Sequence, residues 1–461
     1  MAAPHIVWFR NDLRLSDQAA LAAAAAAGPV IAVHVLDEAS PGVRPVGGAS
    51  RWWLHQSLAA LDAALAERGG RLWLGRGRSD EVLGRLAEAT GAQAIHALRQ
   101  PEPWWPAIEA KVPRLTLHEG TALKPPGHLR TRSGGRFRVF TPYWRAHGAD
   151  GPPPAPKPAP ARITFAQAPG GERLADWGLL PVKPDWAAGF RDAGWQPGEA
   201  GAQAALEEFL PRVAAYDRRR DYPAEAATSR LSPHLHFGEI SPAAAWHAAV
   251  AAAGDDATPW TRQLVWRDFA HETLDQFPES ARVPHRPQFD RMPWTDVSGG
   301  DGARLLRAWQ RGRTGYPLVD AGMRQLWATG WMHNRVRMVA ASFLVKHLMI
   351  DWREGERWFW DTLVDADLAN NAMGWQWVMG SGVDSAPYYR IFAPVGQSER
   401  FEAAAYVRRW VPELRELDDR AIHGPFPDGG PGGYPPPVVE HGFARERALR
   451  AYGALRGHSV A

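Results

Sequence analysis

The sequence has 461 residues, more than one ordinary hydrophobic core organises, and this length indicates at least two domains. Hydrophobic residues make up 45% and charged residues 22%, the balance of a globular protein, and the absence of cysteine excludes disulfides and thiolate metal sites. The formal net charge is only +3, so charge alone does not indicate nucleic acid as a partner.

The N-terminal residues MAAPHIVWFRNDLR lack the basic start and long apolar run of a signal peptide. The apolar run LAAAAAAGPV is broken by Gly28 and Pro29 and is too short to span a membrane. We therefore expect a cytoplasmic protein that does not enter a membrane. No metal site and no protein partner are indicated, and a monomer is expected.

The first 120 residues alternate short apolar runs with helical patterns. Such alternation predicts an α/β domain built on a doubly wound, Rossmann-like parallel sheet. No GxGxxG follows the first predicted strand, which argues against a dinucleotide site of the Rossmann type. Strands are expected at 6–9, 30–36, 71–75, 94–98 and 114–118, and helices at 17–27, 50–67, 79–89 and 105–112.

Residues 151–162, GPPPAPKPAPAR, are a proline-rich linker that cannot form a helix or a central strand. Beyond about residue 195, amphipathic helical patterns predict an all-helical domain. We therefore expect an α/β domain at 1–130, an interdomain connector at 131–195 and a helical domain at 196–461. Within the last of these, helices are expected at 200–216, 241–252, 259–276, 302–312, 318–329, 331–350, 354–364 and 444–457.

Two segments of the helical part combine arginine with hydroxyl or aromatic side chains. TSRLS (228–232) offers three hydroxyls near a predicted helix start, where phosphate binds well, although a serine-capped helix is the commoner explanation. In WTRQLVWRDF, the residues Trp260, Gln263, Trp266 and Arg267 recur at helical spacing. That face suits stacking on bases with contacts to phosphate, and an aromatic core stripe is its ordinary alternative.

A third segment, GWMHNRVRM (330–338), places Trp331, Asn334, Arg335 and Met338 three to four residues apart, as on one helical face. Each of these residue types also occurs in plain helical cores. The segment gains weight because it lies in the same predicted domain as the two described above.

The fourth segment is DADLANNAMGWQWV (365–378). The spacing of Asp367, Asn371 and Trp375 puts a carboxylate, an amide and an indole on one helical stripe. Such a stripe suits a ligand that is polar at one end and aromatic at the other. We also expect Asp365 to pair with Arg337 beside that ligand.

These segments resemble the photolyase/cryptochrome family, and most closely the DNA photolyases that repair cyclobutane pyrimidine dimers. The resemblance runs in collinear order over nearly the whole chain. Its carriers are WFRNDLRLSD (8–17), FTPYWR (140–145), TSRLSPHLHFGEISP (228–242), WRDF (266–269), TGYPLVDAGMRQLWATGWMHNRVRM (314–338), DWREGERWFW (351–360), DADLANNAMGWQWV (365–378) and APYYRIFAP (386–394).

The resemblance implies an N-terminal antenna domain and a helical domain that holds FAD in a folded form. It places Asn371 opposite flavin N5, and it implies an electron-transfer chain of Trp375, Trp352 and Trp294 that refills the flavin. The cofactor-binding positions that it implies are Tyr216, Thr228, Ser229, Arg230, Leu231, Ser232, Trp260, Trp331, Asn334, Arg337, Asp365, Asp367 and Asn371.

The implied reaction is light-driven: excited FADH⁻ donates an electron to a dimer that has been flipped out of the DNA helix. The implied substrate and DNA contacts are Arg220, Gln263, Trp266, Arg267, Arg335, Met338, Trp377 and Arg390.

Two features separate this chain from the closest family pattern. Gln263 stands where many pyrimidine-dimer photolyases carry glutamate, so a (6-4) photolyase stays an alternative, as does a cryptochrome-type blue-light photoreceptor. Against the first alternative, GWMHNRVRM lacks the second histidine of (6-4) enzymes. LRQPEPWW (98–105) does not clearly match the family's folate-binding pattern, so neither methenyltetrahydrofolate nor a deazaflavin is assigned as a second, antenna chromophore.

Overall fold

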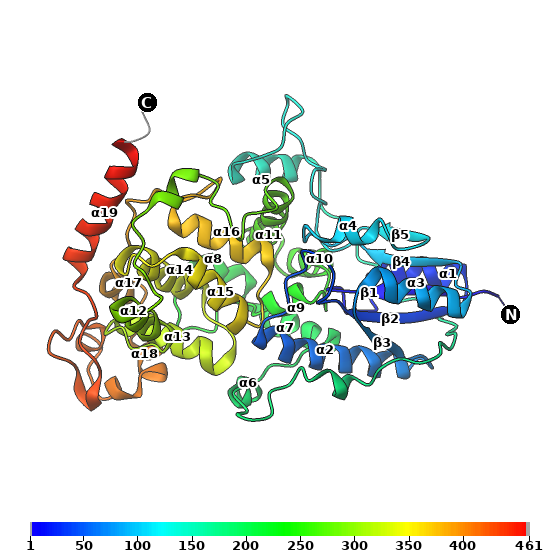
Figure 1. Ribbon diagram of the computed structural model, residues 1–461, viewed down its shortest axis with the longest axis horizontal. Coiled ribbons are helices and arrows are strands. Elements are labelled where there is room, and N and C mark those ends of the chain that lie inside the picture. Colours follow the sequence, from blue (N-terminus) through cyan, green and yellow to red (C-terminus); the bar gives the residue numbers. More distant parts are fainter. Residues whose placement is uncertain (1, 458–461) are drawn as a thin grey trace. The chain divides into compact units, whose positions relative to one another are not determined.

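The structure is a computed structural model that describes residues 2–457 (Figure 1). These residues form two compact units. The first unit holds the described residues up to Ala214 together with Ser229–Pro278, and the second holds Ala215–Thr228 together with the described residues from Glu279 onward. The functional domains expected from the sequence at 1–130, 131–195 and 196–461 stay a prediction.

A parallel five-stranded sheet organises the first unit, in the order β3-β2-β1-β4-β5 (Figure 1). Strands β1 and β2 are buried along their whole length, because helices cover a parallel sheet on both faces, and their sequences are therefore continuous apolar runs. This arrangement confirms the predicted doubly wound fold. The strands are β1 (His5–Phe9), β2 (Val30–Leu36), β3 (Leu72–Arg76), β4 (Ala94–Leu98) and β5 (Leu115–His118).

Helices α3 and α4 pack on one face of this sheet, where Val82 and Leu86 of α3 meet Ile31 and Val33 of β2 in a buried cluster. The four helices expected between the strands are all present, and α4 is shorter than the range 105–112. These are α1 (Ala19–Ala27), α2 (Gly48–Ala66), α3 (Ser79–Thr90) and α4 (Trp105–Glu109).

The first unit also contains helices that follow the sheet in sequence. Residues 151–162 contain neither helix nor strand, as the proline content predicts. Helix α5 was not expected, whereas α11 closely matches the expected range 259–276. The helices are α5 (Phe140–Ala149), α6 (Ala188–Asp192), α7 (Glu199–Phe209), α9 (Ser232–His236), α10 (Pro242–Ala253) and α11 (Thr258–Gln276).

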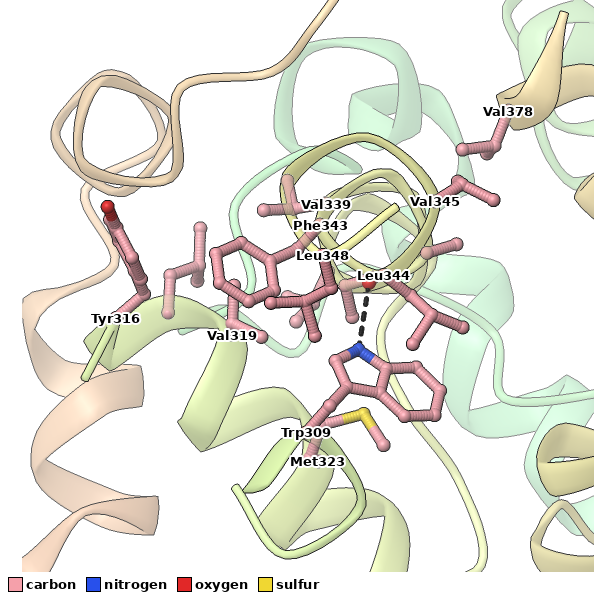
Figure 2. Close-up of a cluster of buried hydrophobic side chains, with 14 of the residues drawn as sticks. Trp309, Tyr316, Val319, Met323, Val339, Phe343, Leu344, Val345, Leu348 and Val378 are labelled. Carbon is pink, nitrogen blue, oxygen red and sulfur yellow. Dashed lines mark hydrogen bonds between the residues drawn. The ribbon is translucent and has the colours of Figure 1, made fainter. Parts of the chain in front are cut away.

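The second unit is helical, as predicted for the C-terminal part. Figure 2 shows part of its buried core, in which the Trp309 indole donates a hydrogen bond of 2.9 Å to the Ala340 carbonyl. Within residues 2–457, no helix has the length and apolar character needed to cross a membrane. The helices are α8 (Tyr216–Arg219), α12 (Gly300–Gln310), α13 (Pro317–Thr329), α14 (Asn334–Ser342), α15 (Trp352–Thr362), α16 (Leu368–Met379), α17 (Pro394–Arg400), α18 (Ala404–Trp410) and α19 (His441–Gly457).

The single helix expected at 331–350 is wrong. His333 caps α14 by accepting a 3.2 Å hydrogen bond from the Arg335 backbone N–H, so the helix begins at Asn334 and Trp331 lies outside it. After Ser342 the chain widens into a buried π-helical turn at Phe343–His347. The predicted common helical face of Trp331 with Asn334 therefore does not form.

Candidate active site

The residues singled out from the sequence are distributed over both compact units, and each unit is described by itself. The second unit holds most of them. The first unit holds Ser229, Arg230, Leu231, Ser232, Trp260, Gln263, Trp266 and Arg267.

Helix α11 positions four of these residues in the first unit. Trp260 is buried in its first turn, with its ring centroid 5.3 Å from that of Phe209. Gln263 is half-buried, and its side-chain amide donates a 2.9 Å hydrogen bond to the Pro259 carbonyl one turn earlier. The amide oxygen of Gln263 accepts no hydrogen bond from residues 2–457 and is available to a ligand.

Trp266 is half-buried and lies flat on Phe140, with ring centroids 3.5 Å apart and an interplanar angle of 7°. Phe269 meets the same indole edge-on at 5.9 Å. The two rings fix the plane of Trp266, and Phe140 covers one of its faces, so a stacked base has to use the other face. Phe140 was not selected from the sequence, although it opens the quoted segment FTPYWR.

Arg267 is held by the protein itself. Its two terminal nitrogens donate to the Thr121 carbonyl at 2.7 Å and the Leu235 carbonyl at 3.2 Å. This anchoring favours a structural role in joining α11 to two other segments. Its expected contact with DNA stays a prediction.

The TSRLS segment reaches the start of a short helix, as expected, because Ser232 begins α9 and Pro233 follows it. Arg230 has a left-handed backbone, with φ of +53°, and its guanidinium lies 3.9 Å above the ring centroid of Trp195. The Ser229 hydroxyl accepts a 3.4 Å hydrogen bond from the Leu231 backbone N–H. Thr228 belongs to the second unit and is half-buried.

The predicted pair of Arg337 and Asp365 is present in the second unit, and it is bidentate. The two terminal nitrogens of Arg337 bind the two Asp365 oxygens at 3.1 and 2.8 Å, and Asp365 is buried. The Nε of Arg337 donates to the Met332 carbonyl at 2.7 Å, and the guanidinium carbon lies 5.9 Å from the Trp331 ring centroid. The cation is therefore fixed in orientation beside an indole.

Helix α16 carries the polar and aromatic stripe expected from its sequence. Asp367 caps this helix, because its carboxylate accepts a 2.7 Å hydrogen bond from the Asn370 backbone N–H. Asn371 and Trp375 follow at one-turn intervals, and Trp375 is buried. The stripe thus starts at a helix cap and ends in the core.

Asn371 is oriented by a residue that the sequence did not reveal as functional. Its side-chain nitrogen donates to the Glu356 backbone carbonyl at 3.1 Å and to the Glu356 carboxylate at 2.9 Å. Glu356 is buried on α15. Since both bonds use the nitrogen, the amide oxygen of Asn371 is left as the acceptor that faces away from Glu356. The only sequence signal for Glu356 was its place in DWREGERWFW.

The three tryptophans expected to transfer electrons differ in their surroundings. Trp375 meets Phe359 at 5.1 Å and Trp309 at 6.3 Å, both edge-on. Trp352 is buried, Trp294 is half-buried, and no ring contact within residues 2–457 joins either of them to Trp375. Trp309, which the sequence did not single out among 23 tryptophans, is thus the indole in ring contact with Trp375.

The segment before and through α14 presents several expected contacts. Arg335 is in an ion pair of 2.6 Å with Asp221, and its guanidinium lies 4.5 Å from the Phe401 ring centroid. Asn334 is exposed, and its amide nitrogen lies 3.8 Å from the sulfur of half-buried Met338. Asp221 was not predicted because an acid that follows three arginines in the sequence is typical of an exposed, charged surface.

Tyr216 and Arg220 lie one turn apart, with the Arg220 guanidinium 5.5 Å from the tyrosine ring centroid. Burial raises the pKa of Tyr216 above its ordinary value. Trp377 is half-buried against the core of the second unit.

Arg390 is exposed, and its position depends on a buried lysine. The Lys346 ammonium donates a 2.9 Å hydrogen bond to the Arg390 backbone carbonyl. Burial, with a smaller effect from the Arg390 charge, lowers the pKa of Lys346 to about 7. Lys346 lies in the π-helical turn at Phe343–His347, a feature that often marks functional segments.

Comparison with known proteins gives consistent matches along the chain. Residues 5–161 match the family model described as DNA photolyase, and residues 260–454 match the one described as FAD binding domain of DNA photolyase. A protein of Agrobacterium fabrum named deoxyribodipyrimidine photo-lyase is 47% identical, over 98% of this chain and 98% of its own.

Two solved structures extend the similarity to the fold. A bacterial class III photolyase from Agrobacterium tumefaciens superposes with a TM-score of 0.93 and 46% identity, covering 99% of this chain and 98% of its own. An archaeal photolyase from Sulfolobus tokodaii, solved with two FAD molecules, has a TM-score of 0.82 and 29% identity, covering 98% of this chain and 100% of its own.

Proposed function

The chain belongs to the DNA photolyase family, and from this membership we propose that it repairs cyclobutane pyrimidine dimers in DNA with FAD and light, as a carbon–carbon lyase. The observation that carries the proposal is the 47% identity, over nearly the full length of both chains, to a deoxyribodipyrimidine photo-lyase. When bound, FAD supplies the light-driven electron donation that opens the cyclobutane ring.

The residues in the second unit have a chemistry that fits this cofactor. Asn371 offers an oriented amide oxygen, and Asp365 offers a carboxylate fixed by Arg337. Both are acceptors of the kind that the N–H groups of a flavin require. Burying the Asp365 carboxylate is costly unless it is hydrogen-bonded, and the two bonds from partly exposed Arg337 meet that condition.

Other residues in each unit suit the phosphates and the electron transfer that the proposed function requires. The hydroxyls of Thr228, Ser229 and Ser232 suit the cofactor phosphates. The buried indole of Trp375 suits electron return to an oxidised flavin, because indole is readily oxidised and its protein surroundings exclude water.

For the substrate, we propose that the open face of Trp266 stacks on the flipped dimer and that the free amide oxygen of Gln263 accepts a hydrogen bond from it. The other expected substrate contacts are weighed by their surroundings. Arg390 is exposed and can contact phosphate directly. Arg335 is already in an ion pair with Asp221, so a contact with phosphate would compete with that ion pair.

The test is direct repair of defined lesions. Purified protein with chemically reduced flavin is mixed with DNA that carries cyclobutane dimers or (6-4) photoproducts, exposed to blue light, and the remaining lesions are counted against a dark control. We expect loss of cyclobutane dimers only. Repair confined to (6-4) products would establish the alternative substrate, and no repair of either lesion would favour a photoreceptor. The expected cytoplasmic monomer without a protein partner stays a prediction, and light scattering would test its oligomeric state.

A further inference from the structure

One strongly basic segment of the first unit contributes none of its basic residues to the proposed catalytic site. Residues 120–149 lead from β5 into and through α5 (Figure 1). They contain no aspartate or glutamate, and we name them the basic segment. Its basic residues are Lys124, Arg130, Arg132, Arg136, Arg138 and Arg145.

Helix α11 holds the backbone of the basic segment through two buried carboxylates. Asp268 accepts hydrogen bonds from the backbone N–H groups of Leu123, at 3.2 Å, and Lys124, at 2.8 Å. One turn later, Glu272 accepts from the Gly127 N–H at 2.7 Å. Because a buried carboxylate needs such donors, these bonds tie the start of the segment to α11.

The return half of the basic segment is tied to the same helix. Arg136 forms ion pairs with Glu272 and, at 2.8 Å, with Asp275, and Gln276 donates to the Phe137 carbonyl at 2.9 Å. Between the two halves, a turn closes where the Thr131 N–H donates to the Gly135 carbonyl at 2.9 Å. The segment is therefore a hairpin-like loop with a defined base.

The acids of α11 that face the loop are thus used in holding it, which leaves the other arginines without acidic partners. Four exposed arginines of the segment, and exposed Arg262 on α11, have no carboxylate within ion-pair distance among residues 2–457. They are Arg130, Arg132, Arg138, Arg145 and Arg262.

The basic segment also touches the proposed base-stacking platform. Phe140, at the end of the loop, is the ring that stacks on Trp266 at 3.5 Å. Arg262 lies 5.3 Å from the Phe140 ring centroid and 5.9 Å from that of Trp144. Arginines without a carboxylate partner among residues 2–457 therefore lie next to the aromatic rings that are proposed to meet the flipped base.

We propose that the basic segment is a second DNA contact, which binds the phosphate backbone beside the lesion without reading sequence or damage. The proposal rests on the proposed function for the identity of the nucleic acid. Arginine suits this role because its fork binds phosphate oxygens in a fixed geometry. Anchoring on α11 means that the loop and Trp266 are positioned by one helix.

The test is the salt dependence of DNA binding in the dark, with the full-length protein. A labelled short duplex, with or without one thymine dimer, is titrated at several salt concentrations. The double variant Arg132→Ala/Arg138→Ala should bind both duplexes more weakly by a similar factor. The slope of log affinity against log salt should fall by about 0.9 for each phosphate that is no longer neutralised, so by about 1.8 for the pair.

Two control variants separate the contact from general charge. Arg71→Ala/Arg162→Ala removes the same charge from exposed positions of the same unit that lie outside the segment, and its slope should match the wild type. Arg132→Lys/Arg138→Lys keeps the charge and should retain most of the slope. All variants change exposed side chains, so circular dichroism should show an unchanged fold.

An unchanged slope in Arg132→Ala/Arg138→Ala would overturn the proposal, as would a loss confined to the damaged duplex, since that would mean lesion reading. If Arg71→Ala/Arg162→Ala lowered the slope by as much as Arg132→Ala/Arg138→Ala does, the effect would be one of net charge, and the proposal would be overturned as well. Because binding is measured in the dark, a failure of the protein to repair dimers in light would refute the proposed function separately.

Discussion

Trp375→Phe separates the supply of electrons to the flavin from the repair reaction itself. The wild-type indole is 2% exposed and lies between Phe359, Trp309 and the bare backbone of Gly355. Phenylalanine keeps an aromatic ring at this position but is much harder to oxidise. The substitution therefore removes the property that electron transfer needs and keeps most of the shape.

The cost to stability follows from these contacts. Complete truncation of a buried tryptophan costs about 3–5 kcal/mol, and each edge-on ring contact is worth about 0.5–1.5 kcal/mol beyond its buried area. Phenylalanine retains one smaller ring against Phe359 and leaves a void where the larger ring approached Gly355. We therefore expect a loss of about 1–3 kcal/mol, which a domain with a free energy of unfolding of about 5–15 kcal/mol tolerates.

The assay uses two routes to the reduced flavin. In blue light with an external reductant, oxidised flavin in Trp375→Phe should stay oxidised while the wild type is reduced, as followed by absorbance. After reduction with dithionite, the variant should repair dimers at close to the wild-type rate. Trp309→Phe is the matched control, because it removes an equally buried neighbouring indole and leaves Trp375 in place.

Rapid photoreduction in Trp375→Phe would refute the assignment of this residue as first electron donor. If Trp309→Phe alone abolished photoreduction, the route would start at, or depend on, the indole that the sequence did not single out. Failure of dithionite-reduced Trp375→Phe to repair dimers, with normal FAD content, would show that the indole also acts in the repair step.

Four further outcomes are expected. Gly355→Ala should lower the denaturation midpoint, because the added Cβ would lie 2.0 Å from Trp375 Cη2, an overpacking cost of about 1–3 kcal/mol that exceeds a helix-propensity gain of up to about 1 kcal/mol; the loss should shrink in Trp375→Phe. Trp266→Ala should weaken lesion-specific binding by about 1–3 kcal/mol in a titration with damaged and intact DNA, with FAD content unchanged. Gln263→Ala should lower dimer repair with FAD still bound, whereas Gln263→Glu should preserve or raise it. Burial raises the pKa of Asp268 from 3.8 to about 7. Its contribution to the free energy of unfolding is therefore present below about pH 4 and is lost as the pH rises through about 7. The stability advantage of the wild type over Asp268→Asn, measured by denaturant unfolding, should fall between about pH 4 and pH 7.

The sheet could be predicted because the sequence of a parallel strand that is buried on both faces is an uninterrupted apolar run. His5–Phe9 and Val30–Leu36 are such runs, and their positions matched closely. The helix expected at 331–350 failed for a local reason. A histidine cap at His333 and a π-helical turn at Phe343–His347 leave the apolar periodicity intact while they change where the helix begins and ends.

The site shows the same division between local and distant information. The bidentate pair of Arg337 and Asp365 was predictable because a buried acid needs a donor, and Arg337 stands in a neighbouring motif. The hydrogen bonds from Asn371 to Glu356 were not, because a single glutamate in a charged segment reads as surface. Only the packing of α15 against α16 distinguishes it.

Helix α11 shows why such partners matter for function. At helical spacing, one set of its residues, Gln263 and Trp266, is proposed to meet the lesion, and another set, Asp268 and Glu272, is buried under a backbone loop. The sequence shows the first set as aromatic and polar residues at suitable spacing, but it gives two acids no visible partner. Since the partners are backbone N–H groups from about 145 residues earlier in the chain, no side-chain pattern can reveal them. Once these backbone partners are known, the basic charge of residues 120–149 can be interpreted. Two acids of α11, Asp268 and Glu272, hold the loop, and Asp150 pairs with Lys124. Within the part of the chain that the structure describes, the exposed arginines of the segment are left without a carboxylate and can bind a partner.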